Sequence, residues 1–297
     1  MSAVAPIDRA GLALAIGGAV AFSGKAIIIK LAYRHGVDAV TLLMLRMAMA
    51  LPLFVALAWW AGRGQPALTA RDWRVVGALG FSGYYLASFL DFLGLQYISA
   101  SLERLILYLN PTLVLLLGWV LYRRRITARQ AGAMALSYAG VLLVFGHEVR
   151  FDGWASATGA LLVFGSAISY AVYLVYSGEM VKRLGTLRLV GWATTIACVL
   201  CLLQFVLLRP LSAAVVAPEV LWLSVVNAVF CTAAPVLMVM MAIERIGSSL
   251  AAQTGMIGPL STIVMGVWIL DEPFNHWILA GTVLVVTGVL WVSRQRT

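Results

Sequence analysis

The sequence is short of charge, and this shortage excludes most classes of soluble protein. Only 11% of the 297 residues are charged, whereas 62% are hydrophobic and the mean hydropathy is +0.96. Such a composition is typical of an integral membrane protein. The net charge of +9 could suggest nucleic acid, but the cations lie in short clusters between apolar runs, as membrane orientation produces. We therefore expect a lipid bilayer around the protein and no nucleic-acid partner.

Catalytic and metal-binding patterns are also lacking. The sequence has no H-E-x-x-H, no G-x-S-x-G and no glycine-rich phosphate loop. Its three cysteines fall inside apolar runs, where packing is their usual role. We expect a protein that is not an enzyme and that needs no cofactor and no metal.

Long apolar runs fill the chain, and about 20 such residues suffice to cross a bilayer as a helix. The pattern predicts an all-α integral membrane protein with ten transmembrane helices. The expected spans are 10–32, 37–60, 74–97, 101–122, 128–146, 158–180, 187–208, 219–243, 249–270 and 276–293.

The second half of the sequence repeats features of the first at an offset of 148 positions. Gly17 is matched by Gly165, and Pro111 by Pro259. Five spans per half is an odd number, so we expect the second copy, 151–297, to be inverted relative to the first, 1–150. Lys and Arg are concentrated in one alternating set of loops, which predicts that both termini are cytoplasmic.

The two matched prolines fall near the middle of the fourth and ninth spans. Pro111 should free the carbonyl of Leu107, which lipid cannot satisfy, so we expect this turn to face protein or a wet cavity. One interpretation is that each proline only kinks a helix for packing. Because Pro111 and Pro259 are in register, we favour a pair of hinges beside a central cavity.

Five ionisable side chains of the expected spans are candidates at membrane depth: Lys25, Arg46, Asp91, Glu103 and Arg104. Lys30, also in the first span, is close enough to the outer end to extend to the membrane surface. Charges at this depth are costly and are functional candidates. The five charges sum to +1, which favours an anionic group such as a carboxylate. They also fit a buried ion network that only fixes helix packing, and this alternative stays open.

Mid-span polar and aromatic residues supply the second signal, because a buried tyrosine needs a partner for its hydroxyl. Tyr84, Ser88 and Asp91 share one face of the third span. The remaining candidates for a semi-polar, aromatic-walled pocket are Tyr85, Tyr108, Tyr170, Tyr173 and Gln253.

The sequence resembles the drug/metabolite transporter (DMT) superfamily. The resemblance is carried by two five-span copies with Asn110-Pro111 and Gly258-Pro259, and by the run Trp268–Pro273, which is similar to the Glu-Pro ending of a helix in the EamA branch. In the first copy, Arg124-Arg125 replaces this ending. Within the branch, the chain most resembles YddG-type exporters of aromatic amino acids in bacterial inner membranes.

This resemblance implies a central cavity walled by the first, third, fourth, sixth, eighth and ninth spans, and export by alternating access. Lys25 would attract a substrate carboxylate, and Asp91 or Glu103 would meet an ammonium group or carry a coupling proton. The alternatives are efflux of cationic drugs on the same fold and, less favoured, a membrane-embedded enzyme or assembly factor.

Overall fold

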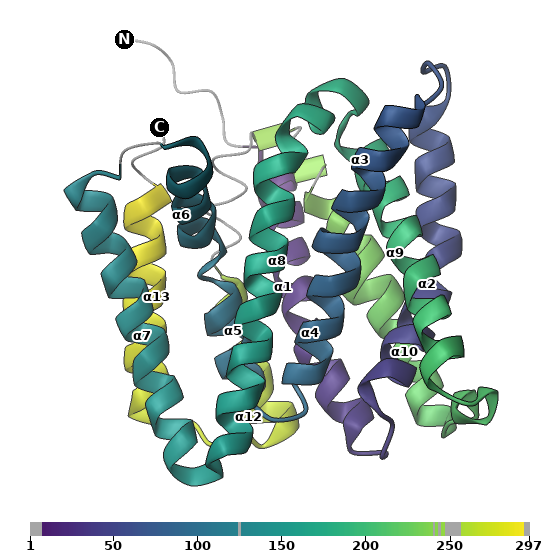
Figure 1. Cartoon of the computed structure of the whole chain (residues 1–297). Helices are drawn as coiled ribbons and strands as arrows, with labels where there is room; N and C mark the ends of the chain where they lie inside the picture. Colours follow the sequence, from purple (N-terminus) through teal and green to yellow (C-terminus); the bar gives the residue numbers. More distant parts are fainter. Residues whose placement is uncertain (1–7, 124–125, 240, 243–244, 247–256, 294–297) are drawn as a thin grey trace.

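The computed structural model describes residues 8–123, 126–239, 241–242, 245–246 and 257–293, and within these the chain forms helices and no strands (Figure 1). Eight helices are long and apolar enough to cross a membrane, and they run from Arg9–Tyr33 to Pro218–Val239. Two shorter apolar helices, Leu260–Leu270 and His276–Trp291, follow them. The expected ninth span, 249–270, lies partly outside the described residues, so the count of ten stays a prediction.

In the first copy, the third and fourth spans are each built from more than one element. The elements are α1 (Arg9–Tyr33), α2 (Ala39–Gly62), α3 (Ala70–Gly80), the π-helix η1 (Phe81–Leu86), α4 (Ala87–Gly94), α5 (Ala100–Leu107), α6 (Asn110–Tyr122) and α7 (Ala128–Asp152). Side chains at the helix starts explain several of these boundaries. Asp38 accepts hydrogen bonds from the backbone at the start of α2, and Thr69 forms a capping box with Asp72 at the start of α3.

The described elements of the second copy follow the order of their counterparts in the first, with one added 3₁₀ turn. They are α8 (Trp154–Leu184), α9 (Thr186–Leu208), the 3₁₀ turn η2 (Leu211–Ala214), α10 (Pro218–Ala228), the π-helix η3 (Val229–Ala233), α12 (Gly258–Leu270) and α13 (His276–Ser293). The π-helices begin at Phe81 and Val229, and α7 and α13 begin at Ala128 and His276. Each pair is 148 residues apart, as the sequence offset requires.

The two copies run in opposite directions. In Figure 1, α1 starts at the top of the view and runs down, whereas its counterpart α8 starts at the bottom and runs up. In the same way α6 ends at the top and α12 at the bottom. Each of these two helices is followed by a non-glycine residue in the left-handed backbone conformation. These residues are Arg123 (φ 50°) and Asp271 (φ 59°), which are again 148 positions apart. The structure is therefore a pair of inverted helical repeats.

Equivalent helices of the two copies pack against each other, α2 along α9 and α7 along α13. Glycines bring these helices close together. A Cβ added to Gly140 of α7 would lie 2.6 Å from the carbonyl oxygen of Gly281 of α13, and a Cβ on Gly191 of α9 would lie 2.8 Å from the backbone of Ala58 of α2. Such small-residue contacts hold helices together where lipid gives no hydrophobic drive to associate.

A carboxylate of the second copy also forms hydrogen bonds with the first copy. Glu272, just after α12, accepts hydrogen bonds from the backbone of Ala100 (2.7 Å) and from the hydroxyl of Ser101 (2.8 Å). These groups form the first turn of α5, where amide donors lack intrahelical partners and a negative charge is favourable. This contact ties the end of α12 to the start of α5, from which the broken fourth span rises to the centre.

We predict that Gly140→Ala lowers the free energy of unfolding by about 1–3 kcal/mol, because the new methyl group would push α7 away from α13. Gly146→Ala on the same helix is the control, since a Cβ there meets no atom within 4 Å. Thermal unfolding of the purified variants in detergent measures the difference. Equal midpoints for the two variants would contradict the close packing of α7 and α13.

Candidate functional site

A cavity of about 560 Å³ lies between the two copies. Residues of α1, η1, α4, α8, η3 and the broken fourth span line it, together with Gly258 at the start of α12. Residues of α2 and α9 also contribute, among them Arg46 and Thr194. The wall therefore includes the second and seventh spans in addition to the six that the family resemblance implied. This volume suits a small metabolite.

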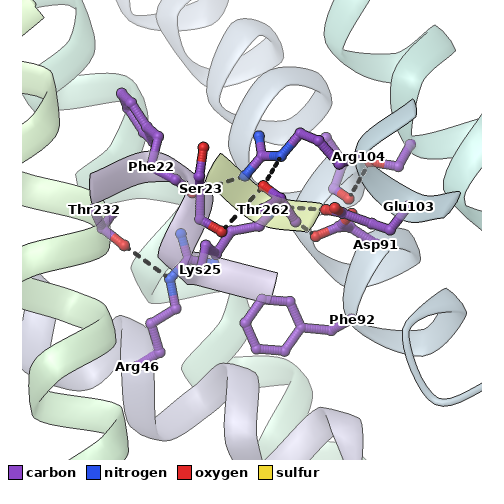
Figure 2. A network of polar contacts seen from close by, with 12 residues as sticks. Phe22, Ser23, Lys25, Arg46, Asp91, Phe92, Glu103, Arg104, Thr232 and Thr262 are labelled. Atoms are coloured by element: carbon purple, nitrogen blue, oxygen red, sulfur yellow. Dashed lines mark hydrogen bonds and ion pairs between the residues drawn. The ribbon is translucent and has the colours of Figure 1, made fainter. Parts of the chain in front are cut away.

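Lys25 is the centre of an ion cluster at one side of the cavity (Figure 2). Its Nζ donates to Asp91 Oδ2 at 2.7 Å and lies 3.3 Å from Glu103 Oε1. Asp91 and Glu103 are almost fully buried, and α1, α4 and α5 each supply one of the three groups. Because one ammonium faces two carboxylates, Lys25 is neutralised within the protein.

Arg104 links three helices beside this cluster. Its Nε donates to Thr262 Oγ1 of α12 (3.0 Å), and its Nη2 donates to the carbonyl oxygen of Phe22 in α1 (2.9 Å). Ser23 of α1 in turn donates to the carbonyl of Gly258 at 2.8 Å. These bonds fix the start of α12 against the first copy, as Figure 2 shows in part.

Arg46, in the middle of α2, is the most isolated charge of the site. Its Nε donates to Thr232 Oγ1 of η3 at 3.1 Å, and its guanidinium carbon lies 5.3 Å from the centre of the Phe92 ring. The Thr232 hydroxyl donates to the carbonyl of Asn227 (2.8 Å), which orients its oxygen toward Arg46. Arg46 is 6% exposed, and its Nη1 is buried with no hydrogen-bond partner among the described residues.

Tyrosines form another part of the wall. The hydroxyl groups of Tyr84 and Tyr173 lie 3.2 Å apart, and the Tyr170 and Tyr173 rings stack with centroids 5.6 Å apart. Tyr84 belongs to η1 and the other two to α8. The serines of α8 satisfy carbonyl groups around η1, because Ser166 donates to Ala87 and Ser169 to Ser82, each at 2.7 Å. π-Helical turns of this kind are frequent at functional sites.

The structure brings six of the sequence-predicted residues into the cavity wall: Lys25, Tyr84, Ser88, Asp91, Tyr108 and Tyr170. Glu103 lies behind Asp91 and reaches the site through Lys25. Tyr173 lies behind Tyr84 and Tyr170, and a Cβ on Gly83 would collide with its ring. Tyr85 packs against Phe81 and Phe89 and is absent from the lining, and Gln253 lies outside the described residues.

The two matched prolines stand in the first turns of α6 and α12. The carbonyl of Leu107, which Pro111 deprives of its helical donor, accepts a hydrogen bond from the Asn110 side chain at 2.7 Å. Leu107, Tyr108 and Asn110 line the cavity, so this turn does face a space inside the protein. A hinge role for Pro111 and Pro259 stays a prediction.

The partners of Arg46 and Arg104 lie in distant segments and could not be predicted from the sequence. The bond from Arg46 to Thr232 joins residues 186 positions apart, and that from Arg104 to Thr262 joins residues 158 positions apart. Threonine in an apolar helix is common, so neither partner stands out by type. Within the described part of the chain, no group of three or more His, Cys, Asp or Glu side chains could hold a metal.

Inverted helical repeats around a central cavity that carries a few charged and hydroxyl groups are typical of membrane transporters. The model of the EamA-like transporter family matches residues 9–146 and again 157–294. The chain belongs to this family.

The chain is 30% identical to the uncharacterized transporter YcbK of Bacillus subtilis, over 94% of this chain and 92% of that protein. It is 23% identical to an uncharacterized transporter of Archaeoglobus fulgidus, over 93% and 94% of the two chains. A crystal structure with 18% sequence identity superposes with a TM-score of 0.65, covering 96% of this chain and 98% of the other. That likeness shows the fold alone.

We predict that Lys25→Met lowers the free energy of unfolding by about 3–5 kcal/mol, because it leaves two carboxylates buried without their cation. Adding Glu103→Gln should restore part of this loss, since only Asp91 then lacks a partner. Chemical unfolding of the two single variants and the double variant measures the coupling. Strictly additive losses would show that Lys25 and Glu103 do not interact.

Proposed function

We propose that the protein is a secondary transporter that exports aromatic or hydrophobic amino acids across the bacterial inner membrane, with both termini in the cytoplasm. The observation that carries this proposal is the composition of the cavity wall. It combines tyrosine rings from both copies with a small set of charged groups, all from the first copy. An amphipathic molecule with one charged end and one apolar end matches such a wall.

The structure supports a modified set of residue roles. Tyr84 and Tyr170 would stack on the substrate side chain, with Tyr173 holding both rings in place. Asp91, which lines the cavity, would meet the ammonium group. Lys25 is already engaged by two carboxylates, so its part is to hold Asp91 and Glu103 in position. Ser88 and Tyr108 add hydroxyl groups to the wall.

Alternating access follows from the inverted repeats, because two copies packed in opposite directions can rock about a site between them. The breaks at Pro111 and Pro259 would act as hinges, since each begins a half-helix at the level of the cavity. Efflux of cationic drugs is the second candidate. Three cations and only two carboxylates at membrane depth favour the amino-acid substrate.

Replacing Tyr170 by alanine should raise the KM for phenylalanine up to about tenfold, because the loss of one aromatic stacking partner costs about 0.5–1.5 kcal/mol. Tyr176→Ala on the same helix is the control, since that side chain is 48% exposed on the outer surface and lies outside the cavity. Uptake of radiolabelled phenylalanine by proteoliposomes measures both. If wild-type proteoliposomes take up phenylalanine no faster than empty liposomes, the substrate proposal is wrong.

A proton is the proposed coupling ion, with Asp91 and Glu103 as its carrier, because these two buried carboxylates share one lysine. We predict that an acidic vesicle interior accelerates phenylalanine uptake as protons leave. Glu103→Gln should abolish this acceleration and retain exchange of phenylalanine at equal pH. If the uptake rate of the wild-type protein is the same with and without the imposed pH gradient, export is facilitated and not coupled to protons.

A further inference from the structure

The cavity has two chemically different poles that the inverted repeat relates to each other. Adding 148 to Arg46 gives Thr194, and adding 148 to Tyr84 gives Thr232. All four residues line the cavity. Each pair combines one residue from each copy. The inverted repeat therefore relates the pair Arg46–Thr232 on one side of the cavity to the pair Thr194–Tyr84 on the other side. Lys25 corresponds in the same way to Tyr173, which lies against Tyr84.

One pole is thus cationic and the other is aromatic. The cationic pole is formed by Arg46 and Thr232, and the aromatic pole by Tyr84 and Tyr170 backed by Tyr173. Lys25, next to the cationic pole, is already neutralised by two carboxylates. A duplicated scaffold would by itself give two equal poles. The two poles differ in their side chains. A molecule with one charged end and one apolar end would therefore bind in one orientation.

Arg46 is the cation of this site that has a buried nitrogen without a hydrogen-bond acceptor among the described residues. Lys25 is bonded to Asp91 and close to Glu103, and Arg104 donates to Thr262 and to the carbonyl of Phe22. Arg46 forms no ion pair within 4 Å in the described part of the chain. Thr232 and the Phe92 ring, both uncharged, are its recorded partners.

A buried guanidinium that has only neutral partners is costly, and its fork geometry matches a carboxylate. The Nε–Thr232 bond fixes the plane of the group, and the buried Nη1 still lacks an acceptor. We propose that Arg46, oriented by Thr232, binds the carboxylate of the transported molecule, while the apolar body of that molecule lies against Tyr84 and Tyr170. This inference rests on the proposed transport function and specifies its substrate class as amphipathic carboxylates.

The test compares phenylalanine with one ligand that lacks its carboxylate and with one that lacks its ammonium group. Phenylalanine, phenylalanine amide and 3-phenylpropionate are titrated against the purified full-length protein in detergent, and each dissociation constant is taken from the shift in thermal unfolding. For the wild type we expect phenylalanine to bind at least about tenfold more tightly than its amide, as the loss of a charged hydrogen bond implies. Arg46→Gln should reduce this ratio to less than about twofold.

Two threonine variants serve as the matched pair. Thr232→Val leaves the Arg46 charge in place and removes the group that orients it, so the ratio should fall to an intermediate value. Thr194→Val makes the same substitution at the aromatic pole, at the position that corresponds to Arg46, and should leave the ratio unchanged. If Arg46→Gln does not yield folded protein, the ratio of the two dissociation constants measured with Thr232→Val tests the proposal.

The outcomes separate this inference from the amino-acid proposal. An unchanged ratio in Arg46→Gln, or in Thr232→Val where only that variant folds, overturns the carboxylate role and leaves amino-acid transport standing. Stabilisation by 3-phenylpropionate that depends on Arg46, without binding of phenylalanine, refutes the amino-acid substrate and supports the carboxylate site. No stabilisation of the wild type by either carboxylate overturns the inference.

Discussion

The structure depends on one constraint: a charged or unpaired polar group at membrane depth must find its partner inside the protein. Lys25, Asp91 and Glu103 meet at one point although α1, α4 and α5 carry them separately. Asn110 supplies the donor that Pro111 removes from Leu107. Each of these contacts joins elements next to the central cavity. The hydrogen bonds and ion pairs that the buried polar groups require therefore also shape the cavity.

Features that repeat or that have a defined depth could be predicted from the sequence. The offset of 148 positions gives the duplicated architecture, and an odd number of spans per copy gives its inversion. The depths of Lys25 and Asp91 allow them to pair, as they do at 2.7 Å. The proline at position 111 predicts both a break in the helix and a polar surrounding for it, because a lost backbone donor has the same consequence in any bilayer.

Features that depend on helix rotation or on distant contacts could not be predicted. Tyr84 and Tyr85 point about 100° apart on a helix, but the sequence does not tell which of them faces the cavity. In the structure Tyr84 lines the cavity and Tyr85 packs against Phe89. Both lie in η1, whose wider turn leaves no mark in the composition. Thr232 becomes a partner of Arg46 only because η3 and α2 are adjacent in space. Its residue type alone carries no such information.

The π-helices, the left-handed helix ends and the starts of α7 and α13 all recur after the same 148 residues. Divergence of the two copies has therefore proceeded by substitution, with no net insertion or deletion across this stretch. One numbering offset serves both copies, although the first connection spans 34–38 in the first copy and only Gly185 in the second. Unlike side chains at equivalent positions are therefore what makes the two ends of one cavity differ in chemistry.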